Sequence, residues 1–225
     1  MNSDKIIKAQ LDAYRPNFIA HGDTPEGTFQ NNSETQQLRF ERIIREFELD
    51  KNCYTLHDIG CGTCDLHQYL LDKKIAHRYS GIEIVPEMIE LSRKKFPDIT
   101  VENYNLISDK NIPMADVTLL SGTLNLNTGG NEAEITEFVC SMIKRMFEIS
   151  RIGISFNMLT SHRTFTDPDL AYFDPAFILD FCIKNLSRFV HIDHAYPLFE
   201  FSVTVFQKEY MKQKFETEAF KKYFK

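Results

Sequence analysis

The stretch Leu56-His-Asp-Ile-Gly-Cys-Gly-Thr-Cys-Asp65 decides how the rest of the chain is interpreted. It follows an apolar run and is rich in glycine, which is typical of a tight turn between a buried strand and a helix. Gly60 permits the turn, and Gly62 lacks a Cβ, so that a ligand can approach the backbone there. Asp58 lies just before Gly60, and its carboxylate would repel a pyrophosphate but attract an ammonium group. The stretch therefore favours a ligand with an ammonium group over a dinucleotide.

Short apolar runs alternate with helical segments on either side of this stretch. Strands are predicted at residues 54–59, 79–84, 99–104, 117–120 and 152–156, and helices at 65–73, 86–96, 132–149 and 175–185. Such alternation indicates βαβ units and a parallel sheet that is buried on both faces. Two last strands, at 189–193 and 201–206, are separated by too few residues for a crossover helix, so they must run antiparallel. The chain is thus predicted to be an α/β protein whose mostly parallel sheet ends in an antiparallel hairpin.

Composition places the chain among globular proteins. It has 225 residues, 43% of them hydrophobic, which is enough for a sizeable core. The formal net charge of −6 argues against nucleic-acid binding, which requires a basic surface. No apolar run approaches the ~18 residues of a membrane span, and the charged start does not resemble a signal peptide. The 5 scattered cysteines indicate free thiols in a reducing compartment, so we expect a cytoplasmic protein.

Three segments are expected along the chain. Residues 1–33 combine an amphipathic start with a turn-rich stretch at 21–27, and we interpret them as a lid over the ligand site. Residues 34–207 form the α/β domain, which opens with a helix that Ser33 can cap. Residues 208–225 carry apolar side chains at helical spacing and are predicted to form a helical tail. Because this tail can lie on the body or on a second copy, we expect a monomer or a homodimer.

A second acid stands where the second strand is predicted to end. Glu83 follows Asp58 at about the spacing expected for a ribose-binding acid, and its carboxylate can accept hydrogen bonds from both ribose hydroxyls. Its neighbour Ile84 can pack against an adenine, and Asn105, after the third strand, can accept a hydrogen bond from the adenine amine. An acid for an amino-acid moiety, an acid for ribose and an amide for adenine together describe S-adenosylmethionine.

On these residues the chain resembles the class I S-adenosylmethionine-dependent methyltransferases. The family pattern, hydrophobic-acid-hydrophobic-Gly-x-Gly-x-Gly, is matched at Asp58, Ile59, Gly60 and Gly62, and the resemblance covers residues 34–207. It implies a doubly wound seven-stranded sheet of order 3-2-1-4-5-7-6 with an antiparallel last strand. The cofactor it implies is S-adenosylmethionine, and the reaction is methyl transfer.

Further motifs refine this resemblance. His21-Gly-x-Thr-Pro-x-Gly27 and Gln36-x-x-Arg39-Phe40 are similar to a bacterial branch of small-molecule methyltransferases without a settled substrate. Two positions depart from the family pattern. Cys64 replaces the third glycine and adds a side chain where the helix starts beneath the cofactor, and Asn105 replaces an acid. The question that Cys64 raises is whether the thiol obstructs cofactor binding.

The cofactor-binding residues that the resemblance implies lie after the first four strands and on the helix before them. They are Asp58, Gly60, Cys61, Gly62, Asp65, Glu83, Ile84, Asn105, Leu106, Ser121 and Arg39. Arg39 is expected either to meet the carboxylate of the cofactor or to form a surface ion pair. No metal site is expected, because Cys61-x-x-Cys64 has no second cysteine pair at metal-binding spacing.

The methyl acceptor is expected at the carboxyl end of the fifth strand, where the ligand crevice of such sheets lies. Asn157 follows this strand, and the polar and aromatic insertion at 160–174, which contains Tyr172, is predicted to wall the acceptor site. Tyr14 is expected to contact the acceptor from the lid. The fourth strand is not followed by the Asn/Asp-Pro-Pro-aromatic motif of enzymes that methylate base amines, which disfavours nucleic acid. We therefore expect a small polar acceptor.

A hydroxyl acceptor also requires a general base with a pKa near neutrality, which histidine provides. His162 and His21 are the catalytic candidates, with His194 as a third. A surface or structural role remains the alternative for each of them.

Three other readings compete with a methyltransferase. The chain can be a non-catalytic module that binds the cofactor or serves assembly, since Cys64 departs from the pattern. An NAD-dependent dehydrogenase shares the strand–glycine–helix layout, but Asp58 opposes it. A redox role of Cys61 and Cys64 is the third, although the glycine loop already accounts for both positions.

Overall fold

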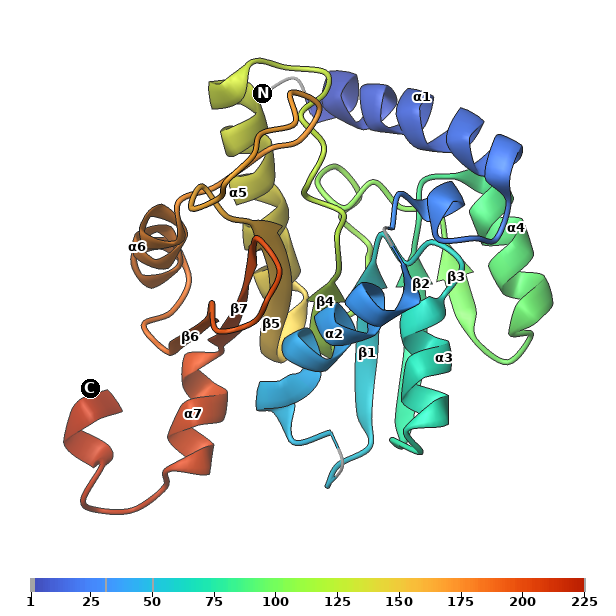
Figure 1. Ribbon diagram of the computed structural model, residues 1–225. Helices are drawn as coiled ribbons and strands as arrows, with labels where there is room; N and C mark the ends of the chain where they lie inside the picture. Colours follow the sequence, from blue (N-terminus) through green and yellow to red (C-terminus); the bar gives the residue numbers. More distant parts are fainter. Residues whose placement is uncertain (1–2, 31, 50, 225) are drawn as a thin grey trace.

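Seven strands form one sheet within the part of the chain that the computed structural model describes, residues 3–30, 32–49 and 51–224 (Figure 1). The strands are β1 Tyr54–Ile59, β2 His77–Ile82, β3 Thr100–Glu102, β4 Ala115–Leu120, β5 Ser150–Leu159, β6 Val190–Asp193 and β7 Glu200–Phe206. The helices are α1 Ser3–His21, α2 Ser33–Ile44, α3 Asp65–Asp72, α4 Pro86–Lys95, α5 Glu132–Glu148, α6 Pro175–Asn185 and α7 Lys208–Lys214. Short 3₁₀ turns lie at Glu26–Thr28, Arg45–Phe47 and Lys221–Phe224. Residues 1, 2 and 31 of the predicted lid, residue 50 of the predicted domain and residue 225 of the predicted tail lie outside the described residues.

The sheet has the order β3-β2-β1-β4-β5-β7-β6, which confirms the predicted fold class. β1 runs parallel to both of its neighbours, so that Leu56 pairs with Tyr79 on β2 and with Val117 on β4. β7 runs antiparallel to both β5 and β6, as the short connection before it required. The carboxyl ends of β1, β2, β4 and β5 consequently meet at one edge of the sheet.

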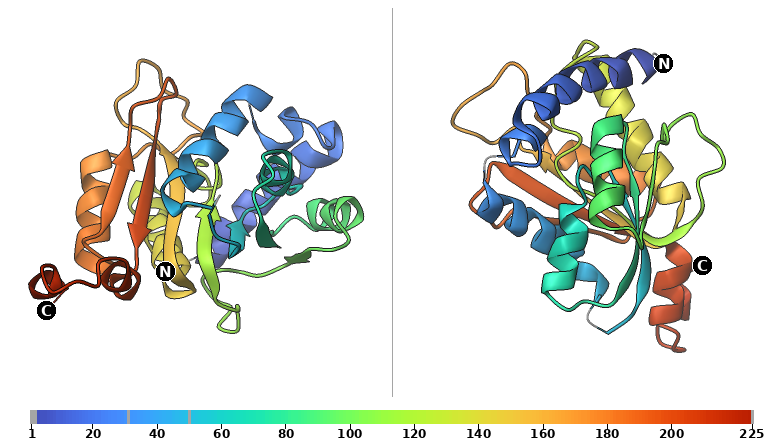
Figure 2. Two further views of the ribbon diagram at one scale, coloured as in Figure 1. Left: turned by 90° about the horizontal axis from the view of Figure 1, so that it is seen from below. Right: turned by 90° about the vertical axis from the view of Figure 1, so that its right-hand side faces the viewer.

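Helices lie on both faces of the sheet (Figure 2), and a hydrophobic core fills the space on each face. On one face α5 and α6 contribute buried side chains such as Phe138 and Ile178. On the other face α2 contributes Ile43, together with apolar residues of α3. Leu119 and Leu120 are neighbours on β4 yet belong to opposite cores, because successive side chains of a strand point to opposite faces.

Two element boundaries near the crevice differ from the prediction. β2 lies two residues earlier than expected, so Glu83 is the first residue after the strand instead of lying within its end. β5 continues to Leu159, because β7 provides a pairing partner, Glu200, opposite that residue. Both differences arise from tertiary pairing, which the local pattern of apolar residues does not contain.

The start of α2 is also corrected. The cap is Asn32 and not Ser33, because the Asn32 side-chain oxygen accepts a hydrogen bond of 2.9 Å from the backbone N–H of Thr35. Ser33 is the first residue inside the helix. Asparagine and serine are similarly good caps, so the sequence alone does not choose between neighbours.

The two terminal segments differ in how firmly they meet the body. α1 is a single helix of 19 residues that continues through Pro16 and lies against α4 and α5 (Figure 1). The tail is not the single helix that was predicted. α7 ends at Lys214 with no buried residue, and its main contact is the Tyr210 ring stacked on Phe206 with 5.8 Å between ring centroids.

None of the described helices is long and apolar enough to cross a membrane. Among the same residues, no group of three or more histidine, cysteine, aspartate or glutamate side chains is arranged to hold a metal ion.

Candidate functional site

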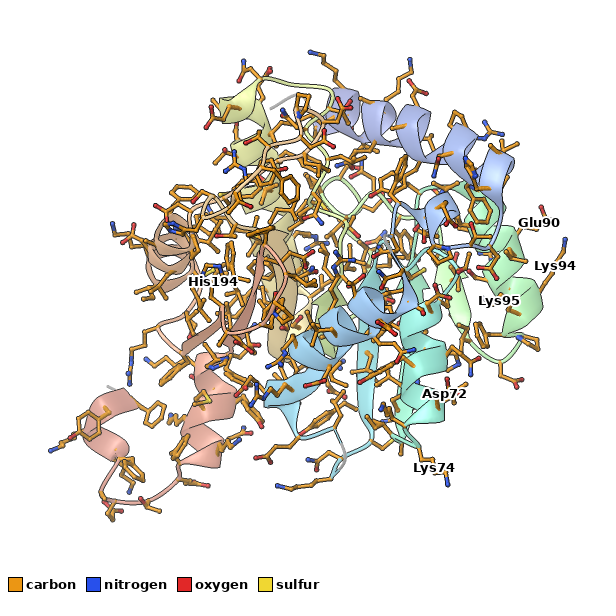
Figure 3. All side chains as sticks on the ribbon, viewed as in Figure 1. Asp72, Lys74, Glu90, Lys94, Lys95 and His194 are labelled. Atoms are coloured by element: carbon orange, nitrogen blue, oxygen red, sulfur yellow. The ribbon has the colours of Figure 1, made fainter. Side chains whose placement is uncertain are left out.

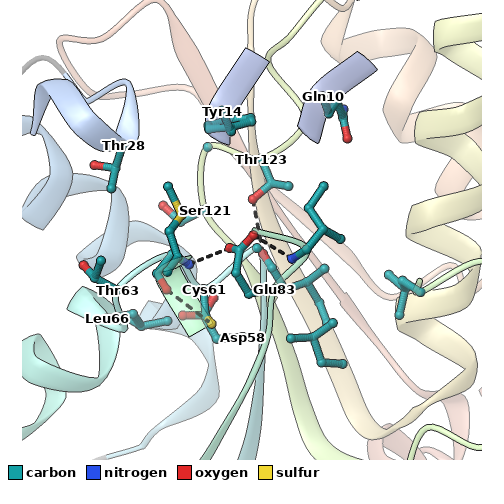
Figure 4. A pocket seen from close by; sticks show the side chains of 18 of the residues that line it. Gln10, Tyr14, Thr28, Asp58, Cys61, Thr63, Leu66, Glu83, Ser121 and Thr123 are labelled. Carbon is teal, nitrogen blue, oxygen red and sulfur yellow. Dashed lines mark hydrogen bonds between the residues drawn. The ribbon is translucent and has the colours of Figure 1, made fainter. Parts of the chain in front are cut away.

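A pocket opens at the carboxyl ends of β1, β2 and β4, with α1 lying across its mouth (Figure 4). The loops after these strands supply its floor, and α1 supplies Ile7, Gln10 and Tyr14. The segment between α1 and α2 adds Thr28 and Gln30. Segments that are far apart in the sequence therefore enclose one site, at the crevice where doubly wound sheets bind ligands.

The turn after β1 depends on its two glycines for different reasons. Gly60 has a φ of +68°, and a Cβ there would lie 2.2 Å from Thr123 Oγ1, so no side chain fits. Gly62 has a φ of +55°, and a Cβ there would approach only Thr28 Cγ2, at 4.0 Å. The backbone of Gly62 is thus bare toward the pocket, which is the condition for close approach of a ligand.

Glu83 connects the loop after β1 to the loop after β2 through hydrogen bonds. Its Oε2 accepts a hydrogen bond of 2.8 Å from Gly62 N, and its Oε1 accepts one of 2.7 Å from Ile84 N (Figure 4). Oε1 also accepts a hydrogen bond of 3.0 Å from Val85 N. Burial raises the pKa of this carboxyl, and the three backbone donors oppose that rise. A carboxylate offers about four lone-pair sites. One site on Oε2 therefore remains for a ligand hydroxyl, where the sequence had suggested room for two.

Asp58 is the second carboxylate of the pocket. It is 3% exposed, and its Oδ2 accepts a hydrogen bond of 2.5 Å from the Tyr79 hydroxyl. Burial raises its pKa well above the ordinary range, and the nearby Cys64, Glu83 and Asp65 add to that rise. Ionised Asp58 is consequently unfavourable in the free protein and would be stabilised by a cation in the pocket.

The pocket is acidic as a whole. Asp58, Asp65 and Glu83 line it, and none of the described residues around it is lysine, arginine or histidine. Asp65 is partly neutralised from outside by Lys95 Nζ at 3.6 Å, and it accepts a hydrogen bond of 3.1 Å from the Gln36 amide. This arrangement suits a ligand that brings its own positive charge.

Cys64 does not obstruct the pocket. It is fully buried behind the loop and is not among the lining residues, whereas Cys61 is. Its φ of +64° is in the left-handed region, which costs a residue with a side chain roughly 1–2 kcal/mol relative to glycine. The family pattern explains this conformation, because glycine is the expected residue there.

The structure brings ten of the predicted cofactor-binding residues to the pocket. They are Asp58, Gly60, Cys61, Gly62, Asp65, Glu83, Ile84, Asn105, Leu106 and Ser121. For Asn105 the predicted hydrogen bond to adenine needs correction. Its side-chain oxygen accepts bonds of 3.1 Å and 3.3 Å from Ile107 N and Ser108 N, so it already stabilises its own turn.

Arg39 is the exception in this group. Its guanidinium donates to Glu200 Oε1 and Oε2 at 2.9 Å and 3.0 Å, and to Gln30 Oε1 at 2.5 Å. Arg39 does not line the pocket. The prediction of contact with the cofactor carboxylate is therefore not met, and the ion pair with Glu200 is buried rather than at the surface.

The predicted acceptor residues are dispersed. Tyr14 lines the pocket, and burial together with the nearby Glu83 raises the pKa of its hydroxyl. Asn157 is fully buried and does not reach the pocket. Its side-chain oxygen accepts a bond of 2.9 Å from Gly122 N, and its amide donates to Glu200 at 2.7 Å. Asn157 thus supports the loop after β4 from behind.

Tyr172 and the insertion around it do not wall the pocket either. Its hydroxyl accepts a bond of 3.0 Å from Asp167 N, and its ring lies 3.7 Å beneath the Arg163 guanidinium. No residue from 160–174 lines the pocket. The insertion instead folds against the loop after β4, where Ala171 N donates to Asn125 O at 2.8 Å.

The histidine candidates are also outside the pocket. His162, His21 and His194 are exposed, and none of them lines it. His162 and His194 lie beside each other, with 6.2 Å between ring centroids. Figure 3 places His194 by the β6–β7 connection, on the opposite side of the molecule from the labelled residues of α4. The assignment of a histidine general base is therefore corrected for this structure.

Several pocket residues escaped the sequence prediction. Among them are six uncharged polar residues: Gln10, Thr28, Gln30, Gln36, Thr63 and Thr123. One signal was available, since Ile7, Gln10 and Tyr14 are spaced three and four residues apart and so share one face of a helix. No comparable signal existed for Gln30, which is held through Arg39.

The fold and this acidic, glycine-lined pocket define the architecture of a class I methyltransferase. No family model matches the chain. The chain is 30% identical over 155 residues to Rv1506c of Mycobacterium tuberculosis, a provisionally assigned methyltransferase, and the match covers 68% of this chain and 92% of that protein. The chain therefore belongs to the class I S-adenosylmethionine-dependent methyltransferase family.

Solved methyltransferase structures have the same fold. One is magnesium protoporphyrin IX methyltransferase of Synechocystis PCC 6803 with bound S-adenosylhomocysteine, with a TM-score of 0.64 and 12% identity over 87% of this chain and 99% of that chain. Another is human N-acetylserotonin methyltransferase in complex with S-adenosylmethionine, with a TM-score of 0.59 and 12% identity over 77% of this chain and 53% of that chain.

Proposed function

We propose that this protein transfers the methyl group of S-adenosylmethionine to a small polar acceptor. One observation carries the proposal: Asp58, Gly60, Gly62 and Glu83 meet in a pocket at the crevice of the methyltransferase fold. Family membership and the cofactors bound to the structural neighbours support it.

The pocket suits this cofactor in charge and shape. Asp58 would face the ammonium group, and the remaining lone pair of Glu83 Oε2 would accept one ribose hydroxyl. The bare backbone of Gly62 permits close approach. Ile84 and Leu106 provide apolar contacts for the adenine. The bound cofactor supplies a methyl group that is already activated by a positively charged sulfur.

The acceptor would enter on the side of α1. Gln10 and Tyr14 of α1 and Gln30 of the following segment line this part of the pocket. The helix α1 itself would exclude water from the site. Because Gln30 Oε1 is held by Arg39, its NH₂ group is turned toward Gly122 and can donate to an acceptor oxygen. The protein then mainly has to align the acceptor with the methyl group.

Two measurements test the proposal. Titration calorimetry should detect binding of S-adenosylhomocysteine to the wild type, and Asp58→Ala should weaken it by about 1–3 kcal/mol, the value of a charged hydrogen bond. The control is Asp72→Ala, which removes an exposed acid at the end of α3 and should change nothing. Absence of binding at roughly millimolar ligand, about 4 kcal/mol of affinity, would overturn the proposal.

A non-catalytic cofactor-binding role is the second candidate, because no histidine is among the described residues that line the pocket. The two candidates share cofactor binding and differ in turnover. Incubation with S-adenosylmethionine and a metabolite extract, followed by mass spectrometry, separates them. A product heavier by one CH₂ group excludes the second candidate.

We further propose that the protein acts in the cytoplasm, without nucleic acid, as a monomer or homodimer. All of its cysteines are free thiols, and its net charge of −6 opposes nucleic acid. Light scattering of the purified chain tests the oligomeric state, and a mobility-shift assay with DNA and RNA should show no binding.

A further inference from the structure

Cys61 and Cys64 lie together beneath the turn that follows β1. Cys64 N donates a hydrogen bond of 2.9 Å to Cys61 O, which closes a β-turn between them. Such a turn brings its end Cα atoms within about 7 Å of each other, close to the range that a disulfide spans. The two thiols are also close enough to shift each other's pKa.

The two sulfurs differ in access. Cys61 lines the cofactor pocket, whereas Cys64 is fully buried behind it. Cys61 is held closely against β2, since a Cβ on Gly81 would lie only 2.5 Å from its sulfur. A small reagent that enters the free pocket therefore meets Cys61 first, and a bound cofactor would cover it.

The two sulfurs also differ in charge. The hydrogen bond from Cys61 lowers the pKa of Cys64, and Ser92, Tyr79 and Lys95 lower it further. The same hydrogen bond and burial raise the pKa of Cys61. When Cys64 is ionised, the pair keeps one proton, which lies on Cys61. The Cys64 thiolate is then the better nucleophile of the two.

We propose that Cys61 and Cys64 are a thiol modification site which hydrogen peroxide oxidises to a disulfide and which bound cofactor protects. The Cys61 proton passes to the Cys64 thiolate, and the Cys61 thiolate attacks one peroxide oxygen. The O–O bond breaks, and the departing hydroxide takes the proton from Cys64 to form water and restore the Cys64 thiolate. The Cys64 thiolate then attacks the sulfur of the Cys61 sulfenic acid, the S–S bond forms and hydroxide leaves. Two thiol sulfurs are oxidised by two electrons, and peroxide is reduced to water and hydroxide.

Disulfide formation would disturb the cofactor site directly. The sulfurs must approach to about 2.05 Å, which moves the loop that contains Gly62. Gly62 N is bonded to Glu83 at 2.8 Å, and Gly62 O accepts from Ser92 Oγ at 2.9 Å. Oxidation therefore reduces cofactor affinity, a consequence that rests on the proposed function. The thiol chemistry itself does not depend on it.

The experiment treats the full-length chain with hydrogen peroxide and maps each cysteine by alkylation and mass spectrometry. We expect Cys61 and Cys64 to lose alkylation together, to regain it with dithiothreitol, and to react more slowly with S-adenosylhomocysteine bound. Exposed Cys53 reports the overall oxidant dose. The proposal is overturned if Cys61 and Cys64 remain thiols, or react separately, at doses that oxidise Cys53.

Titration with S-adenosylhomocysteine then measures the functional effect. Oxidised wild type should bind about tenfold more weakly or worse, and reduction should restore it. Cys64→Gly is the matched control, because glycine accepts a φ of +64° and the variant cannot form the disulfide. It should bind before and after peroxide. Equal affinity of oxidised and reduced wild type would contradict the proposed effect, whereas failure of the reduced protein to bind would contradict the cofactor assignment instead.

Discussion

The two sides of the pocket are built in different ways. The side that we assign to the cofactor consists of loops that follow β1, β2, β3 and β4, and the residues predicted in these loops line the pocket. The acceptor side consists of α1 and the segment before α2, and of its predicted residues only Tyr14 lines the pocket. Asn157 and Arg39 lie behind it and hold residues that do line it, Gly122 and Gln30.

This difference shows which kind of site a single sequence reveals. A turn that needs glycines and an acid at fixed spacing is a local feature, so the sequence alone predicts it. A wall that depends on where a distant helix docks is a tertiary feature. Exposed histidines near a strand end gave no indication that α1 would close the site from the other direction.

The largest expected effect concerns the supports behind the acceptor side. Arg39→Leu leaves Glu200, which is 2% exposed, as an unpaired buried carboxylate. We expect a loss of about 3–5 kcal/mol of unfolding free energy in urea titration, the cost of breaking a buried pair. The double variant with Glu200→Leu should recover much of it. A loss below about 1 kcal/mol in the single variant would show that the pair is solvated like a surface ion pair.

The next largest effect concerns the cofactor side. Glu83→Gln replaces a carboxylate that accepts three backbone N–H groups, and its NH₂ group would face a donor. Binding of S-adenosylhomocysteine in calorimetry should weaken by about 1–3 kcal/mol. Glu87→Gln is the matched control, since Glu87 pairs with Arg15 outside the pocket. Equal effects in both variants would remove the role assigned to Glu83.

A smaller effect separates the two residues predicted after β5. Asn157→Leu removes the acceptor of Gly122 N and should weaken binding of S-adenosylhomocysteine by about 1 kcal/mol, one hydrogen bond. His162→Ala removes an exposed ring and should leave the affinity unchanged. A larger loss of affinity in His162→Ala than in Asn157→Leu in the same titration would show that His162 belongs to the site.

The last expected effect is a pH dependence of stability beneath the cofactor side. His67 Nδ1 lies 2.8 Å from His77 Nε2, and burial, followed by the charge of His77, lowers the pKa of His67 to about 4. An unfolded histidine titrates near pH ~6.5. The unfolded chain therefore binds a proton that the folded chain does not, and thermal stability should fall between about pH 6.5 and 4.

His67→Phe tests this dependence, because phenylalanine can occupy the aromatic cluster with Tyr79 and Phe96. The variant should show a flatter melting temperature across that pH range. His194→Gln, at an exposed histidine by the β6–β7 connection, should keep the wild-type slope. An unchanged slope in His67→Phe would assign the dependence to other groups.

Much of the fold was predictable, because strand runs and the short connection before β7 are local patterns. β1 and α6 lie at their predicted bounds, Tyr54–Ile59 and Pro175–Asn185. What escaped prediction depends on distant partners. β5 extends to Leu159 because β7 pairs with it. In the tail, α7 buries none of its residues, so the apolar spacing that suggested one long helix had little packing to stabilise it.

In the candidate site, too, the local features were predictable and the tertiary contacts were not. The positions of Asp58 and Glu83 follow from the turn itself, but their hydrogen bonds do not. Tyr79 occupies one oxygen of Asp58, and three backbone groups occupy most of Glu83. The orientation of Gln30 depends on Arg39 and Glu200, three positions that no spacing rule connects.

A crystal structure of the complex with S-adenosylhomocysteine tests the central claim most directly. The account predicts a ribose hydroxyl on Glu83 Oε2, the ammonium group on the side of Asp58, and the sulfur facing Tyr14 and Gln30. An adenosyl group bound outside this pocket, or bound with its ammonium group directed away from Asp58, would contradict it.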